Sequence, residues 1–205
     1  MAPRGGDEAA RPLLPGSAPE AGAYGTWSVV LVYLGLGSIL MGTYVWGVVT
    51  LFQRYGTAMR LWGRIGEPGN EALLHTYYIS ILAAAVGFFP SLAYALRVAP
   101  KLPRRTVNLI CGSFAGFYLT EMAWMPMCVA YIIHRQEIIY VAIRLQLAVS
   151  GIFALVWLAA KLFAIPSDVG RGAGPVLRAA GLLGTAIFAL HCAILDAVVW
   201  PPNFK

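Results

Sequence analysis

The sequence predicts an all-α, polytopic membrane protein built as a bundle of about five transmembrane helices, with four as the alternative count. Hydrophobic residues make up 59% of the 205 residues and charged residues only 12%, and the mean hydropathy is +0.70. Apolar runs that reach the roughly 20 residues needed to cross a bilayer recur along the chain. The basic residues, which give a net charge of +6, lie between these runs, as expected for residues that flank membrane spans.

The bundle is expected to occupy residues 25–202, between two short tails. Residues 1–24 are rich in Pro, Gly and Ala and have almost no aromatic side chains, which is typical of a disordered segment. They contain no apolar stretch of roughly 7–15 residues, so they do not resemble a signal peptide. Residues 203–205 form the C-terminal tail.

The first span is predicted at residues 27–52, with aromatic side chains at both of its ends. Ser38 and Gly42 are small residues four positions apart, a spacing that predicts close contact with another helix. Residues 53–74 then alternate arginines with apolar residues. This pattern favours a short amphipathic segment in the membrane interface, ended by a turn at residues 67–70.

The second and third spans are predicted at residues 75–97 and 106–133. Their link is short and basic, so the two spans should form an antiparallel hairpin. Each contains a proline, Pro90 and Pro126, which removes a backbone hydrogen bond and should kink its helix. The third span also carries Gly112 and Gly116, a GxxxG pair that predicts close helix packing.

The fourth and fifth spans are predicted at residues 140–163 and 176–199. The loop between them, at residues 165–175, contains enough Gly and Pro to be mobile. Nine Lys and Arg residues fall on the side of the N-terminal tail and six on the other side. By the positive-inside rule, this difference favours an N-terminus in the cytoplasm, although the identity of the membrane is not readable.

Glu121 is the central functional candidate, because a carboxylate near the middle of a span is costly unless it faces protein, water or a partner. The predicted topology places other polar and aromatic residues in the same half of the bilayer. This grouping suggests a vestibule with two carboxylates and a histidine at its floor. Its candidate members are Glu121, Asp196, His191, His75, Tyr77, Tyr78, Trp124 and Trp200. The alternative is a neutral Glu121 that only bonds one helix to another.

Several kinds of chemistry have no sequence support. His191 and Asp196 are five residues apart, about 140° around a regular α-helix, so they are poor co-ligands for a metal. We predict no metal site and no cofactor. The usual nucleotide-binding and hydrolase motifs do not occur, and the basic residues are not arranged to bind nucleic acid.

Three functions remain open. The first is an oligomeric small channel or transporter-like protein that moves a proton, an ion or a small solute past Glu121 and Asp196. The second is a non-catalytic scaffold or assembly subunit of a larger membrane complex, with the glycine-rich faces as docking surfaces. The third is a membrane-embedded lipid-binding protein or enzyme. The expected partners are the lipid bilayer and either further copies of the chain or other membrane proteins.

Overall fold

The computed structural model describes residues 20–204, and five of its helices are long and apolar enough to cross a membrane. Residues 20–204 contain no strand, so the predicted all-α bundle is confirmed. Residues 1–19 of the tail predicted at residues 1–24 lie outside the described residues, as does Lys205. The spans extend beyond the expected limits and cover Ala23–Tyr55, Glu71–Lys101, Arg104–His134, Glu137–Ala164 and Pro175–Asn203.

Several of the spans change helix type along their length. The first span, which we call the N-terminal helix, consists of α1 (Ala23–Val30), the π-helix η1 (Leu31–Leu36) and α2 (Gly37–Tyr55). The next three are formed by α3 (Glu71–Val98) with η3 (Ala99–Lys101), by α4 (Arg104–His134), and by α5 (Glu137–Ala159) with the π-helix η4 (Ala160–Ala164). The fifth is α7 (Pro175–Leu190), the π-helix η5 (His191–Val199) and α8 (Trp200–Asn203).

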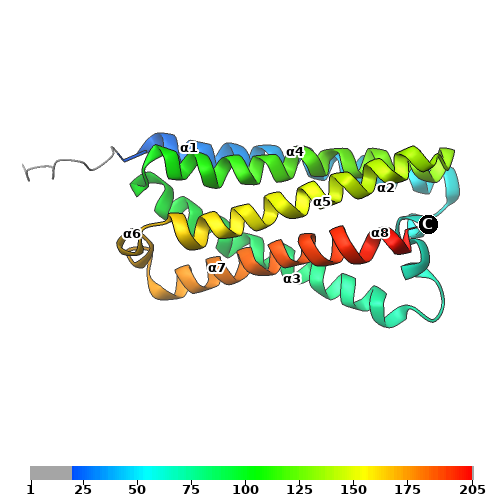
Figure 1. Cartoon of the computed structure of the whole chain (residues 1–205). Helices are drawn as coiled ribbons and strands as arrows, with labels where there is room; N and C mark the ends of the chain where they lie inside the picture. The colour runs from blue at the N-terminus through cyan, green and yellow to red at the C-terminus, as the bar shows by residue number, and fades with distance from the viewer. Residues whose placement is uncertain (1–19, 205) are drawn as a thin grey trace, which may run out of the picture.

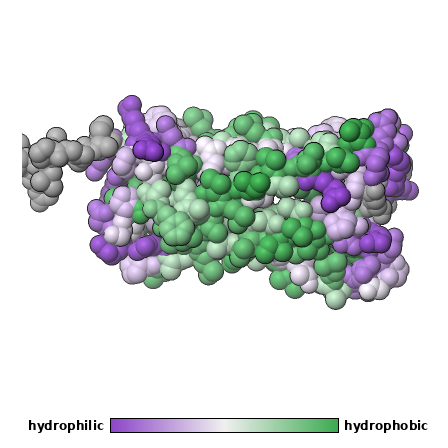
Figure 2. Space-filling model, viewed as in Figure 1, coloured by the Kyte–Doolittle hydropathy of each residue, from purple (hydrophilic) through white to green (hydrophobic). Residues whose placement is uncertain are grey.

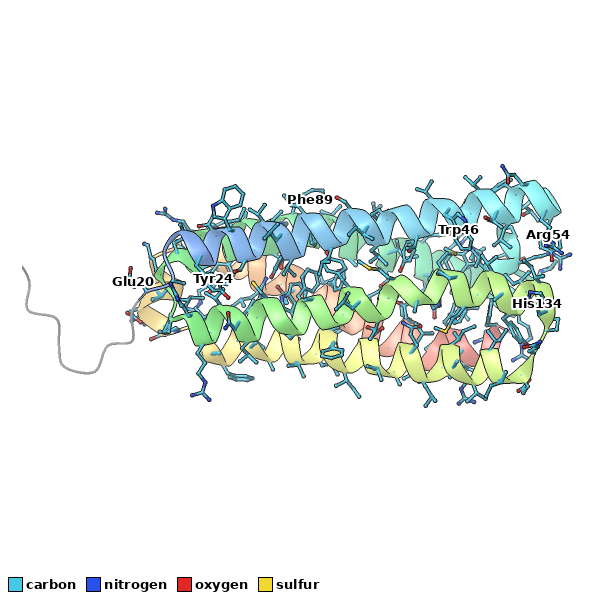
Figure 3. All side chains as sticks on the ribbon, turned by 90° about the horizontal axis from the view of Figure 1, so that it is seen from above. Glu20, Tyr24, Trp46, Arg54, Phe89 and His134 are labelled. Atoms are coloured by element: carbon cyan, nitrogen blue, oxygen red, sulfur yellow. The ribbon has the colours of Figure 1, made fainter. Side chains whose placement is uncertain are left out.

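The five spans run side by side along one common direction (Figure 1). Helix α3 packs mainly against α7, α4 against α5, and α2 against α4. Glu20 lies at one end of the bundle and the C-terminus at the other, as an odd number of spans requires (Figures 1 and 3). Pro90 and Pro126 both lie inside continuous helices, α3 and α4.

The outer surface is apolar over the middle of the bundle. Figure 2 shows hydrophobic residues across the central part of this face and hydrophilic residues gathered at its two ends. Large apolar side chains such as Ile79, Leu82 and Val86 on α3, and Leu145 and Ile152 on α5, are exposed there. A surface of this kind requires a hydrocarbon environment, which supports contact with the lipid bilayer and an integral membrane protein.

Two connecting segments are more ordered than the sequence suggested. The backbone N–H of Ala21 donates to Leu102 O at 2.8 Å, so the ordered chain begins before residue 24. Residues 165–175 include the short helix α6 (Ser167–Arg171). The loop that was predicted to be mobile therefore contains a short helix.

The predicted interfacial segment forms the 3₁₀ helix η2 (Met59–Gly66), which packs against the end of the chain. Trp200 Nε1 donates to Leu61 O at 3.1 Å, and Leu61 and Ile65 are buried. The segment therefore caps one end of the bundle rather than lying free on the membrane. The fifth span continues past residue 199, because Pro201 and Pro202 occupy the first turn of α8, where a missing N–H costs little.

Of the glycines predicted to pack closely, Gly116 contacts another span, whereas Gly42 and Gly112 contact none within the described chain. A Cβ atom added to Gly112 or Gly42 would meet only open space, and Gly116 lies against the ring of Phe153 rather than against a backbone. The close backbone approach occurs instead between Gly87 of α3 and Gly184 of α7. Small residues do permit this contact, but their spacing in the sequence did not identify the pair.

Candidate functional site: an acidic cavity between the N-terminal helix and α3

The bundle encloses a cavity of about 670 Å³. It is bounded by the N-terminal helix, α3, α4 and the fifth span, with Leu147 of α5 at one edge. Carbon atoms make up most of its wall, and its polar side chains include Glu121, Asp196, His191 and Tyr44. This size and character are typical of binding sites for small amphipathic molecules.

The apolar part of the cavity lies near the middle of the bundle's length. Its α3 residues begin at Ile81, ten positions after the first residue of α3 at Glu71, which corresponds to roughly 15 Å along the helix. Phe89, another wall residue, lies midway along the bundle between the end marked by Glu20 and the end marked by Arg54 (Figure 3). The polar end of the cavity lies nearer to the C-terminal end of the bundle, because Asp196 is only seven positions before Asn203, the last residue of the fifth span.

The cavity opens through the side of the bundle. One edge of the opening is formed by a row of residues on the N-terminal helix, and the other edge by a row of residues on α3. Each row follows helical spacing, and its members both line the cavity and are exposed on the outer surface. The rows are Leu34, Ser38 and Met41, and Ile81, Ala85 and Phe89. The hydroxyl of Ser38 donates to Leu34 O at 2.7 Å, so the opening presents a mainly apolar rim to the lipid.

Glu121 is buried in α4 with 5% of its surface exposed, and its side chain has partners on two other helices. Tyr44 of α2 donates to Oε2 at 3.2 Å, and Gln146 Nε2 of α5 donates to Oε1 at 3.3 Å. Gln146 also donates to Ser150 Oγ at 2.9 Å, and Ser150 in turn donates to Thr120 Oγ1. Glu121 is thus fixed at the end of a polar network between α4 and α5 while it still lines the cavity.

His191 and Asp196 come together, contrary to the expectation from α-helical geometry. They lie in η5, a π-helix, where the i→i+5 pairing widens each turn and brings residues five apart onto one side. His191 Nε2 is 3.4 Å from Asp196 Oδ2, and His191 Nδ1 is 2.9 Å from Ser80 Oγ of α3. The contacts of His191 orient the Asp196 carboxyl group. Ser80 is not part of the described cavity wall, so its hydroxyl group is not presented as a nucleophile to a molecule in the cavity.

Trp124 completes the polar end of the cavity. Its ring makes edge contacts with Tyr44 and Trp200, in each case with 5.5 Å between the ring centroids. Its Nε1 atom is buried and has no hydrogen-bond partner among the described residues. A buried N–H group without a partner is costly, so a bound molecule that supplies an acceptor would be favoured if a small movement of the ring exposes the donor to the cavity.

The structure brings together only part of the predicted vestibule. Glu121, Asp196, His191 and Trp124 line one cavity, with Ser38 on its rim. His75 and Tyr78 do not line it: both are exposed, and Tyr78 packs against Trp62. Tyr77 and Trp200 are buried in the packed core near the cavity.

Sequence reasoning missed two residues of the site's polar network. Gln146 and Ser80 are ordinary polar residues in apolar runs, and no spacing rule connects them with Glu121 or His191. Tyr44 was expected at the end of the first span and on the side of the vestibule, but its hydrogen bond to Glu121 was not predicted. Their location inside predicted spans was the one available signal, because a polar side chain there needs a partner.

Packed side chains fill the bundle on both sides of the cavity. One cluster includes Phe114 and Trp157, whose rings stack with centroids 4.1 Å apart. The other includes Tyr140, Trp200 and Phe204. The cavity is therefore separated from both ends of the bundle by apolar side chains, and its exposed wall residues face the lipid. Among residues 20–204, no group of three His, Cys, Asp or Glu side chains is placed to hold a metal ion.

Comparisons of the chain with protein families, with curated proteins and with solved structures find no match. The residues and geometry of the cavity are therefore the basis for assigning a function.

Proposed function

We propose that this protein binds an amphipathic molecule that enters its cavity from the lipid bilayer. Such a molecule places its polar group near Glu121, Asp196 and Trp124 and its hydrocarbon body along the apolar wall. The observation that carries the proposal is the side opening between Leu34–Met41 and Ile81–Phe89, at mid-membrane depth and with a mainly apolar rim.

The position of the opening favours a membrane-soluble ligand over a water-soluble one. A solute from water would have to pass one of the packed clusters around Phe114 and Trp200. A molecule dissolved in lipid needs only to move sideways between two helices. The cavity volume of about 670 Å³ also falls in the range of roughly 300–1,000 Å³ found for small-molecule sites.

Transport is a second candidate, favoured by the placement of Glu121 and Asp196 in one cavity between the spans. A transporter of this design would expose the two carboxylates alternately to the two sides. Proteoliposomes should then show uptake of protons or solute that Glu121→Gln abolishes without changing the size of the purified particle. Equal uptake by empty liposomes and by the wild-type protein would exclude this candidate.

The binding proposal is tested by photolabelling the full-length protein in phosphatidylcholine nanodiscs with an alkyl-diazirine fatty alcohol. Labelled peptides are identified by mass spectrometry. We expect labels on the α3 and N-terminal helix residues that line the cavity, and competition by excess unlabelled fatty alcohol. Labels spread evenly over the lipid-facing surface, without competition, would contradict the proposal.

Two neighbouring substitutions sharpen this test. Ala85→Trp places a large ring on the rim of the opening and should reduce cavity labelling by about tenfold. Val86→Trp adds the same ring at an adjacent exposed position outside the cavity wall and should leave the labelling unchanged. Equal labelling of the two variants would mean that the ligand does not pass this opening.

A further inference from the structure

The polar end of the cavity is acidic and has no basic counterpart. Glu121 and Asp196 both line it, whereas the wall formed by the described residues includes no Lys or Arg. His191, the one histidine of that wall, is held between Ser80 and Asp196. Lys161, a buried base of the bundle, donates to Ser91 and Thr185 instead. A bound molecule therefore meets two carboxyl groups in an apolar environment.

An acidic site of this kind favours a ligand that carries a positive charge. A carboxylate transferred into a medium of low dielectric constant loses its hydration and is stabilised most by an opposite charge in contact with it. The protein supplies Glu121 with two neutral donors, Tyr44 and Gln146, and with no cation. An ammonium group placed between the two carboxyl groups would provide the missing charge and hydrogen-bond donors.

Aromatic rings form much of the remaining wall beside these acids. They include Tyr44, Phe88, Phe117, Tyr118 and Phe188. The face of an aromatic ring attracts an ammonium group, and this attraction is strongest where water is excluded. The wall thus suits both an ammonium group and the carbon chain attached to it.

The indole of Trp124 adds a requirement that an ammonium group alone cannot meet. Its buried Nε1 is a hydrogen-bond donor without a partner among residues 20–204, and an ammonium group has no acceptor to offer. A hydroxyl oxygen can accept that bond and can also donate to a carboxylate. A ligand with an ammonium group and a hydroxyl group on neighbouring carbons would satisfy both features.

We propose that the ligand is a long-chain amino alcohol, an inference that rests on the binding function proposed above. Its ammonium group lies between Glu121 and Asp196, and its hydroxyl oxygen accepts a hydrogen bond from Trp124. The hydrocarbon chain runs along the aromatic wall and leaves through the opening between the N-terminal helix and α3.

The test compares three photoreactive probes that have the same diazirine-bearing hexadecyl chain and differ only in their headgroups. They carry a 2-amino-1-hydroxyl group, a primary amine, or a 1,2-diol. Each is titrated into the full-length wild-type protein in phosphatidylcholine nanodiscs, and half-saturation of cavity labelling is measured. We expect the amino alcohol to bind about tenfold more tightly than the diol, with the amine between them.

Matched variants assign the headgroup contacts. Glu121→Gln and Asp196→Asn should each remove most of the preference for the amino alcohol over the diol. Trp124→Phe should remove only its preference over the amine, because this change deletes the N–H and keeps an aromatic ring, although a smaller one. Glu67→Gln, at an exposed position outside the cavity wall, serves as the control acid and should change neither preference.

The possible failures are distinguishable. Equal cavity labelling by all three probes, or a preference for the diol, would overturn the amino-alcohol proposal. Either result would still support binding of a ligand from the lipid. No cavity labelling by any probe would overturn the binding function itself. The comparison of probes on the wild-type protein decides between these outcomes even where a variant fails to fold.

Discussion

The two sides of α3 differ sharply in how they meet the rest of the bundle. On one side, Gly87 and Ser91 lie against Gly184 and Thr185 of α7, with the backbones in direct contact. On the opposite side, Ile81, Ala85 and Phe89 border a cavity and face the N-terminal helix across an opening. One helix therefore has a packed interface on one side and a cavity on the other.

Each side of α3 also has ionisable side chains within the bundle. Those on one side are tightly packed, and those on the other side border the cavity. Lys161 has 2% of its surface exposed, donates to Ser91 O, Ser91 Oγ and Thr185 Oγ1, and lies 4.4 Å from the centroid of the Trp157 ring. The void beside it measures about 10 Å³. Glu121 and Asp196 instead line the large cavity. We interpret an ionisable side chain that borders the cavity as a candidate for ligand binding. We interpret one that protein atoms surround on all sides as a contact that stabilises the fold.

The largest loss of stability should follow the removal of the buried lysine. Lys161→Ala deletes the donor for three contacts and leaves a hole in the packed side, and we expect a loss of about 3 kcal/mol in unfolding free energy. Lys161→Met should cost less, because Ser91 and Thr185 still bond each other and the volume is kept. Thermal unfolding in detergent measures both changes. A Lys161→Ala variant as stable as one with Lys101→Ala, an exposed position, would contradict the assigned role.

The next largest effect should come from the glycine contact. A side chain added by Gly184→Ala would overlap the backbone of Gly87, so we expect a cost of roughly 2 kcal/mol from displacement of α3 and α7. The methyl group added by Gly112→Ala would point into open space, so this substitution should stabilise the helix by roughly 0.5–1 kcal/mol. Thermal unfolding again provides the comparison. A smaller particle in detergent for Gly112→Ala would show instead that Gly112 packs against another chain, as its GxxxG spacing predicts.

The cavity side should tolerate neutralisation of its central acid. Glu121→Gln retains the shape of the side chain and an acceptor for Tyr44, so we expect the unfolding free energy to change by less than about 1 kcal/mol. Labelling by the amino alcohol should fall in the same sample. A stability loss as large as that of Lys161→Ala would identify Glu121 as a structural bond between helices.

The smallest effect on stability should come from the rim of the opening. Phe89 is 68% exposed, and Phe89→Ala removes a ring that mainly contacts lipid. We expect little change in the unfolding temperature and faster exchange of the bound probe, measured by competition after ligand loading. Unchanged exchange would show that this ring does not restrict the opening.

The sequence alone was sufficient for the class of the fold, because long apolar runs leave a helical bundle as the main solution in a bilayer. It also selected Glu121 and Asp196 as candidates, since an acid inside a span needs an explanation. Their placement in one cavity could not be predicted, because it depends on which helices become neighbours. The pairing of Gly87 with Gly184 depends on the same choice.

The other features that the sequence did not predict have local structural causes. The π-helical turns of η5 bring His191 and Asp196 together, and no residue pattern in HCAILDAVV indicates a change from α-helical geometry. Lys161 stands near the end of its span, a position typical of flanking charge, so its burial was not anticipated. Gln146 escaped attention for a similar reason, because its partner Glu121 lies on another helix.

The most direct test of the central claim is a crystal structure of the full-length protein grown from a lipidic mesophase doped with the long-chain amino alcohol. The proposed function predicts elongated electron density that passes between Ser38 and Ala85 and ends beside Glu121 and Asp196. A closed contact between the N-terminal helix and α3, with the space beside Glu121 filled by protein side chains, would contradict it.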